Sequence, residues 1–165
     1  MRTRIREGII ESEIGTLAVG RRGLVLVAEW IVGRDEPPRF EPSDKMASAF
    51  LEAYARYFRG RFQAFGRLPI GDGTPFQCRV WERCRRIDPG ETRTYGWIAS
   101  ELRLRPVHCR AIGNALRANP LPIAVPCHRV VAATGIGGYA GARTGPLADI
   151  KNRLLAFESA MRRES

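Results

Sequence analysis

The chain has 165 residues, of which 44% are hydrophobic, so it is long and apolar enough to bury a core and is not a disordered chain. It carries 27 Lys and Arg against 17 Asp and Glu, and the excess is uneven, because residues 1–72 carry +2 and residues 73–165 carry +8. No apolar run approaches the roughly 20 residues that a membrane-spanning helix needs, and no apolar segment follows the charged N-terminus as in a secretory signal. We therefore expect a cytoplasmic protein without membrane contact, and the basic second half favours a polyanionic partner, although basicity also serves solubility.

The first seventy residues predict a small antiparallel sheet followed by one helix. Three β-rich runs at residues 5–10, 16–19 and 24–30 are separated by short turn-forming segments. Ser43 is placed to cap a helix whose apolar residues recur at helical spacing and which ends at Gly60.

The second half predicts a mainly helical unit. A Gly- and Pro-bearing linker divides an N-terminal domain, residues 1–70, from a C-terminal domain, residues 73–165, whose first helix Thr74 can cap. Thr94 can cap a second, short helix, and a third follows over residues 107–117, which together form a helix-turn-helix pattern. We therefore predict an α/β protein of the α+β kind, with a winged-helix-like helix-turn-helix in its second domain.

The cysteines and histidines do not form a metal-binding pattern. None of Cys78, Cys84, Cys109 and Cys127 stands in a C-x-x-C pair, and both histidines lie in the second half. We therefore expect no metal site, and no disulfide among the first three cysteines in a reducing cytosol.

Pro126-Cys127-His128-Arg129-Val130 places a thiol beside an imidazole after an apolar run. The thiolate is the reactive form of cysteine, and a neighbouring base makes it available near neutral pH. Taken alone, such a pair also suits a structural cysteine, since free cysteine is among the residues most often buried. The surrounding residues decide between the two interpretations.

An ordered series of motifs surrounds this segment. The series comprises Gly73-Thr74-Pro75-Phe76-Gln77, Val80-Trp81, Thr94-Tyr95-Gly96, Arg110-Ala111-Ile112-Gly113, Asn119-Pro120, Gly137-Gly138-Tyr139-Ala140-Gly141, Lys151, and Leu154-Leu155 with Glu158. It covers roughly half of the chain and resembles the O6-alkylguanine-DNA alkyltransferases, also called methylated-DNA–protein-cysteine methyltransferases. The first seventy residues carry no diagnostic motif.

The resemblance implies the chemistry of the site. Cys127 would accept the alkyl group, and His128 would take the thiol proton, directly or through a water. Glu158 would orient the histidine as in a triad and so lower the pKa of the thiol, while Asn119 would hold the nucleophile-bearing segment in shape. Without the resemblance, Glu158 suits an exposed carboxylate at a helix end, and Asn119 suits a turn residue or helix C-cap.

The resemblance also implies a pocket for an extruded base, lined by Tyr95, Leu116, Pro122, Val130, Tyr139 and Ala140. Tyr95 would use its hydroxyl on the guanine ring, although it also suits a core position. The backbone N–H groups of Tyr139 and Ala140 and the carbonyl of Val130 would address the guanine edge. Two features depart from the family: many relatives carry serine where Ala140 stands, and the loop at residues 141–150 looks longer than usual.

DNA contacts are implied for the second helix of the helix-turn-helix. Arg110 would enter the duplex and fill the gap left by the flipped base. Ala111 and Gly113 would permit close approach of the helix to the minor groove, and Arg117 would contact a phosphate. Without the resemblance, Arg110 suits a phosphate contact or a solvated charge, and the small residues suit close helix packing.

Together these implications predict a monomeric, cofactor-free methylated-DNA–[protein]-cysteine S-methyltransferase. It would repair O6-alkylguanine, and O4-alkylthymine, in double-stranded DNA, and each molecule would act once because the thioether is stable. A non-catalytic binder of alkylguanine is the first alternative, but in such relatives the nucleophile position is not cysteine. A helix-turn-helix transcription regulator is the second, and it explains the charge but not the Cys-His-Arg segment.

Overall fold

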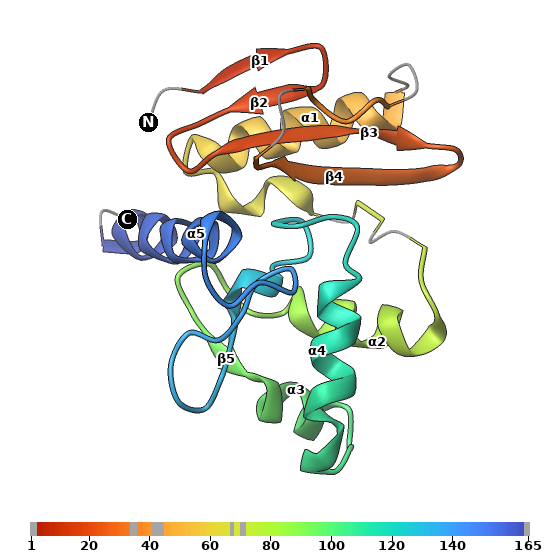
Figure 1. The fold of residues 1–165 in the computed structure, drawn as a ribbon, viewed down its shortest axis with the longest axis vertical. Coiled ribbons are helices and arrows are strands. Elements are labelled where there is room, and N and C mark those ends of the chain that lie inside the picture. The colour runs from red at the N-terminus through yellow and green to blue at the C-terminus, as the bar shows by residue number, and fades with distance from the viewer. Residues whose placement is uncertain (1–2, 34–35, 41–44, 67, 70–71, 164–165) are drawn as a thin grey trace.

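The computed structural model describes residues 3–33, 36–40, 45–66, 68–69 and 72–163. A small sheet and one helix lie at one end of the molecule and a mainly helical unit at the other (Figure 1). The antiparallel sheet has the order β1-β2-β3-β4, formed by β1 (Arg4–Arg6), β2 (Ile9–Glu11), β3 (Thr16–Arg22) and β4 (Val25–Ile31). The predicted antiparallel meander and the α+β class are therefore confirmed.

The predicted first strand is wrong, because residues 5–10 form a hairpin instead of one strand. Glu7 and Gly8 both have positive φ, 42° and 82°, which is the backbone that tight two-residue hairpin turns require. A Cβ at Gly8 would lie 2.8 Å from the carbonyl oxygen of Val19, so only glycine fits there. Isoleucines on both sides of the turn continue the hydrophobic pattern across it, so the pattern gives no sign of the turn.

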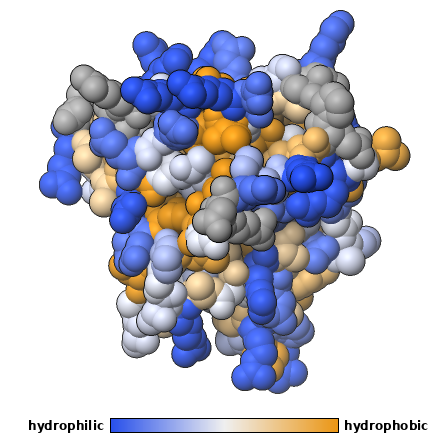
Figure 2. All heavy atoms as spheres, turned by 45° about the horizontal axis from the view of Figure 1, so that its top comes forward, coloured by the Kyte–Doolittle hydropathy of each residue, from blue (hydrophilic) through white to orange (hydrophobic). Residues whose placement is uncertain are grey.

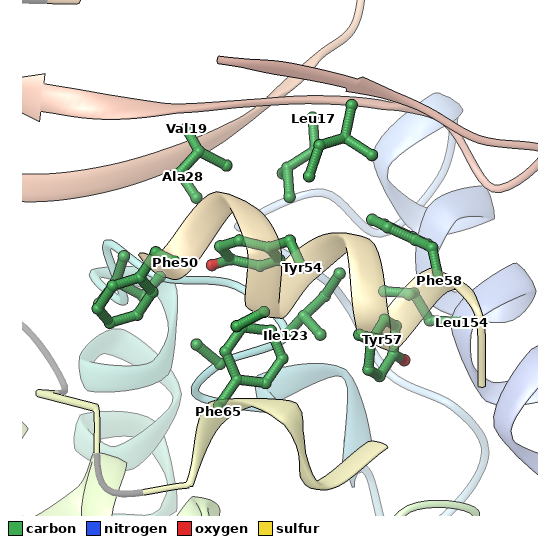
Figure 3. Close-up of a cluster of buried hydrophobic side chains, with 14 of the residues drawn as sticks. Leu17, Val19, Ala28, Phe50, Tyr54, Tyr57, Phe58, Phe65, Ile123 and Leu154 are labelled. Carbon is green, nitrogen blue, oxygen red and sulfur yellow. The ribbon is translucent and has the colours of Figure 1, made fainter. Parts of the chain in front are cut away.

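Helix α1 (Lys45–Phe58) covers one face of the sheet (Figures 1 and 3). Its buried residues are Ala47, Phe50, Ala53, Tyr54, Ala55, Tyr57 and Phe58. Burial of each large side chain contributes about 1.5–3 kcal/mol, so this face anchors the helix. Gly60 follows the helix with a φ of 82°, in agreement with the predicted stop, whereas Ser43, the predicted cap, lies outside the described residues.

The second half contains short elements joined by tight turns. After η1 (Phe62–Phe65), which still belongs to the first half, they are α2 (Pro75–Cys84), β5 (Arg93–Thr94), α3 (Tyr95–Glu101), η2 (Pro106–His108), α4 (Cys109–Arg117), η3 (Cys127–Arg129), β6 (Val130–Val131) and the longer α5 (Pro146–Arg163). Thr74 caps α2 in a reciprocal pair with Gln77, and Thr94 caps α3 through the N–H of Trp97, both as predicted.

The predicted helix-turn-helix corresponds to α3 and α4, which η2 connects. Strands β5 and β6 form a parallel pair only two residues long. The winged-helix-like detail therefore stays a prediction.

Two hydrophobic cores fill the molecule, and they do not divide cleanly between the two halves of the sequence. The first core contains α1 and the sheet, but also Leu121, Ile123 and Leu154 from the second half, two of which are labelled in Figure 3. The second core lies among the helices α2, α3 and α4. Cys127 packs against both cores, so it lies where they meet. The predicted domain boundary at residues 70–73 stays a prediction.

In the face shown in Figure 2, hydrophilic side chains project over most of the area and hydrophobic atoms form patches between them. Within the described part of the chain, no helix combines the length and apolar character needed to cross a membrane.

Candidate active site

Asn119 makes hydrogen bonds along the segment that ends at Cys127. Its Nδ2 donates to the carbonyl of Val125 (2.9 Å) and to Cys127 Sγ (3.3 Å), and its Oδ1 accepts from the N–H of Leu121 (3.0 Å). Ile123, in the middle of the segment, has a φ of 71°, which is strained for a β-branched residue. The hydrogen bonds of Asn119 therefore stabilise a loop conformation that the chain would not adopt alone.

The N-terminal unit holds the same segment from the other side. The N–H of Ala28, in β4, donates to the carbonyl of Pro120 (2.8 Å). The hydroxyl of Tyr54, in α1, donates to the carbonyl of Pro122 (2.7 Å). The position of the nucleophile thus depends on both halves of the chain.

Glu158 is fully buried in α5 and accepts hydrogen bonds from several elements. Arg129 donates from Nε to Oε2 (2.9 Å) and from Nη2 to Oε1 (2.7 Å), and the N–H of Gly90 donates to Oε2 (3.0 Å). The Nε2 of His128 lies 2.9 Å from Oε1, and the hydroxyl of Tyr57 lies 2.6 Å from the same oxygen. Burial opposes ionisation, but the neighbouring His128 and Arg129 outweigh it and hold the pKa of this carboxyl well below its ordinary value.

His128 is a neutral base whose Nε2–H points at Glu158. An ionised carboxylate only accepts hydrogen bonds, so Nε2 carries the proton that it shares with Glu158, and Nδ1 keeps a lone pair. Burial lowers the pKa of His128, which favours the uncharged ring. Nδ1 is buried without a hydrogen-bond partner among the described residues. The ring is therefore prepared to accept a proton at Nδ1.

Cys127 is a half-buried free thiol at the start of η3. Burial raises the pKa of the thiol, although the hydrogen bond from Asn119 and the nearby Lys151 act in the opposite direction. The expected depressed pKa is therefore wrong for this state of the protein. The resting pair is a neutral thiol beside a neutral imidazole, so a proton has to move when the sulfur reacts.

Lys151, one of the residues of the motif series, is fully buried in α5 and organises the loop around the site. Its Nζ donates to the carbonyls of Val130 (2.7 Å), Ile136 (2.7 Å) and Gly138 (3.1 Å). Burial lowers the pKa of Lys151 to about 8. The Val130 carbonyl that was expected to address the guanine therefore already accepts one hydrogen bond, and Val130 is fully buried and lines neither of the two cavities at Cys127 described below.

A cavity of about 400 Å³ reaches the sulfur of Cys127. Among the residues predicted to bind substrate or DNA, those that line it are Tyr95, Gly113, Leu116, Arg117, Tyr139 and Ala140. The N–H of Tyr139 donates to the carbonyl of Ala142 (2.8 Å) within a tight turn, so it is not free to meet a base. Of the two N–H groups predicted for that role, Ala140 is the remaining candidate.

A second cavity, of about 270 Å³, reaches Cys127 from the side of the sheet. The predicted pocket residue Pro122 lines this cavity and not the first. Trp30 and Leu147 also line it, and the indole N–H of Trp30 donates to the hydroxyl of Tyr139 (3.0 Å). The segment at residues 141–150 is a loop only as far as Gly145, because α5 begins at Pro146, and its greater length relative to the family stays a prediction.

Helix α4 presents one exposed face beside the mouth of the larger cavity. Arg110, Ala111, Asn114 and Arg117 are exposed, and their spacing places them along this face. Asn114 and Arg117 line the cavity itself. A Cβ at Gly141 would lie 2.6 Å from Arg117 Nε, so this arginine packs on the rim formed by the loop.

Tyr57, Arg129 and Lys151 are among the residues of the site that received no role from the sequence. Arg129 lies inside the quoted motif, and the rule that a buried arginine needs a carboxylate partner could have linked it to Glu158. Nothing in the sequence could have linked Tyr57 to the site, because it lies 101 residues away from Glu158.

Known proteins match this sequence and this fold. Residues 75–160 match the family described as "6-O-methylguanine DNA methyltransferase, DNA binding domain". A methylated-DNA–protein-cysteine methyltransferase of Mycolicibacterium paratuberculosis is 37% identical over 153 residues, which cover 90% of this chain and 89% of that protein. The corresponding protein of Haemophilus influenzae is 41% identical over 91 residues, which cover 52% of this chain and only 50% of that protein.

Solved structures agree over a longer stretch. The crystal structure of Mycobacterium tuberculosis O6-methylguanine methyltransferase has a TM-score of 0.70 and 34% identity, covering 93% of this chain and 92% of that one. A structure of the M. tuberculosis protein in complex with DNA has a TM-score of 0.69 and 33% identity, with the same coverage. The family match spans half of the chain and the mycobacterial matches extend through the N-terminal sheet, so this chain belongs to the 6-O-methylguanine DNA methyltransferase family.

Proposed function

We propose that this protein repairs DNA directly by moving the alkyl group of O6-alkylguanine onto Cys127. One observation carries the proposal: Cys127 lines a cavity and is followed in the chain by a histidine whose Nε2 is held by a buried carboxylate and whose Nδ1 has no hydrogen-bond partner among the described residues. The same arrangement explains why no cofactor is needed, since the acceptor and the base both belong to the chain.

The proposed reaction balances within the site. The Cys127 proton passes to His128 Nδ1, directly or through a water, while sulfur attacks the alkyl carbon and the bond from that carbon to O6 breaks. The electron pair of the broken bond stays on guanine, which takes up one proton at a ring nitrogen from the hydroxyl of Tyr95, and the proton that the imidazolium later releases to solvent balances the one that restores this hydroxyl. Glu158 stabilises the imidazolium while it exists. The product thioether is stable, so each molecule acts once.

DNA would be bound through the exposed face of α4 in the minor groove, by a monomer in the cytoplasm. A base inside a duplex cannot reach Cys127, so it has to be extruded into the cavity of about 400 Å³. Arg110 lies on the exposed α4 face, one turn before Asn114 at the cavity mouth, and would fill the gap in the stack. Phosphate contacts carry little sequence information, which suits a repair protein.

Alkyl groups longer than methyl would extend into the second cavity, next to Pro122 and Leu147. That cavity borders Cys127, so a substituent on the attacked carbon has space beside the sulfur. O4-alkylthymine presents a similar alkylated oxygen, and we propose it as a slower substrate.

The decisive test is the mass of the protein after reaction with duplex DNA that contains O6-methylguanine. We expect one added methyl group per molecule, on the peptide that contains Cys127. Cys127→Ser should abolish transfer and keep DNA binding, whereas the matched control Cys78→Ser, another half-buried free cysteine, should transfer normally. Several turnovers per molecule, or a methyl group on another cysteine, would contradict the proposal. A protein that bound alkylated DNA without gaining mass would instead be a recognition factor.

A further inference from the structure

The carboxylate beside His128 receives a hydrogen bond from the other half of the chain. The hydroxyl of Tyr57 lies 2.6 Å from Glu158 Oε1, and both side chains have no exposed surface. Tyr57 belongs to α1, the helix beneath the N-terminal sheet, and points away from the sheet toward α5 (Figure 3). Resting on the function proposed above, we propose that Tyr57 is a positioning residue for alkyl transfer, which acts through Glu158 to keep His128 uncharged.

Three donors share one oxygen of Glu158. Oε1 of Glu158 accepts from Tyr57, from Arg129 Nη2 (2.7 Å) and from His128 Nε2 (2.9 Å). Each donor withdraws charge from the carboxylate and so weakens its attraction for a proton on the imidazole. Removal of the Tyr57 hydroxyl would leave more charge facing His128, which favours the imidazolium and raises the pKa of the ring. An imidazolium cannot accept the thiol proton, so transfer would fail at a higher pH than in the wild type.

Other ionisable groups also affect the protonation of His128. The ionisable groups around Glu158 and His128 are Tyr57 from α1, Cys127 and Arg129 from η3, Tyr139 from the following loop, and Lys151 from α5. Arg129 and Lys151 disfavour the imidazolium and Glu158 favours it. Among the residues that the structure describes, Tyr57 is the neutral donor that the N-terminal unit contributes to the shared oxygen.

The ring of Tyr57 is held independently of its hydroxyl. It makes edge-on contacts with Phe58, Phe62 and Phe157, at centroid distances of 5.5, 5.3 and 5.8 Å. Tyr57→Phe therefore keeps the packing and removes one donor from Glu158. The fold should survive, because Arg129 and Gly90 still bind the carboxylate.

Helix α1 also supplies a matched control. Tyr54 lies one turn before Tyr57, has no exposed surface, and donates its hydroxyl to the second half of the chain as well. Its acceptor, however, is the neutral carbonyl of Pro122 and not the carboxylate. Tyr54→Phe thus removes a similar buried hydrogen bond without changing the charge that faces His128.

The experiment measures the single-turnover rate of methyl transfer from pH 5 to pH 9 for the wild type and both variants. We expect Tyr57→Phe to shift the acid limb upward by about half a pH unit or more, with a plateau at high pH close to the wild type. Tyr54→Phe can change the rate but should leave the midpoint of the limb unchanged. Equal midpoints in all three proteins, or equal shifts in both variants, would overturn the proposal.

Two further measurements test Tyr57 even if alkyl transfer is absent or Tyr57→Phe does not fold. NMR titration of the His128 ring in the protein without DNA should show the same upward shift in Tyr57→Phe, so Tyr57 is tested even if alkyl transfer itself is absent. If Tyr57→Phe does not fold, 3-fluorotyrosine at position 57 keeps the ring and makes the hydroxyl a stronger donor. The midpoint should then move downward, and an unchanged or raised midpoint would reject the positioning role.

Discussion

The cations inside this protein and those on the exposed face of α4 are held in opposite ways. Arg129 and Lys151 are buried. Their charged nitrogens donate hydrogen bonds to the carboxylate of Glu158 or to backbone carbonyls. Arg110 and Arg117 lie on the exposed face of α4. The interior charges therefore set the geometry and proton affinities of the site, and the exposed charges serve association. The first group should respond to mutation and pH, and the second to salt.

The largest effect should come from removing one partner of the buried ion pair between Arg129 and Glu158. Arg129→Leu leaves the charge of Glu158 buried without its guanidinium, so we expect the free energy of unfolding to fall by about 3–5 kcal/mol. Urea unfolding at pH 7 measures this loss. The control is Arg162→Leu, which removes a mostly exposed side chain 3.4 Å from Glu91 and should cost about 0–1 kcal/mol. Similar small losses in both variants would show that the buried pair is dispensable.

Removing the charge of Glu158 should affect the reaction strongly. Glu158→Gln no longer stabilises an imidazolium, so we expect transfer at pH 7 to slow by about 10- to 100-fold. Part of the rate should return at alkaline pH, where thiolate forms without a base, and single-turnover kinetics across pH measure both effects. Glu91→Gln, which changes a carboxylate outside the site, should react normally. A rate that Glu158→Gln leaves unchanged would reduce this carboxylate to a structural role.

An exposed cation should matter only for duplex substrate. Arg110→Ala should slow repair of O6-methylguanine in duplex DNA by about tenfold, because the extruded base then leaves an unfilled gap. Transfer from free O6-benzylguanine needs no flipping and should change little. Arg56→Ala, which removes an exposed arginine paired with Glu52 in α1, is the control and should leave both rates unchanged. Equal losses of Arg110→Ala on the two substrates would contradict the intercalating role.

The smallest effect should be the pH dependence of Lys151. Its pKa in the folded protein is lowered to about 8, so between pH 8 and its ordinary value of 10.5 the unfolded chain binds more protons than the folded one. The contribution of Lys151 to stability should therefore rise with pH in that window and stay constant below it. Comparison of urea unfolding of the wild type with Lys151→Met from pH 7 to 10.5 measures this difference. A difference that does not vary with pH would show that the buried amine titrates normally.

Local features of the molecule were predictable from the sequence. The caps at Thr74 and Thr94 depend on hydrogen bonds to residues three positions away, so the local sequence is sufficient to specify them. The Pro-Cys-His-Arg-Val segment and the ordered motifs likewise predicted the family, which the comparisons confirm, together with a candidate nucleophile and base that stay predictions. The hairpin at Glu7 and Gly8 was missed because the apolar pattern on both sides of it is continuous.

What the sequence by itself determined is thus the fold class, most of the helices, the thiol that precedes an imidazole in the chain, and the basic second half. Only the tertiary structure decided how these groups behave, because long-range contacts and loss of solvent depend on packing. Tyr57 and Glu158 meet across 101 residues, and Arg129 meets Glu158 across 29. Burial raises the pKa of Cys127 where the motif alone predicted a depressed one. Desolvation is a property of the folded environment, and no local pattern of residues encodes it.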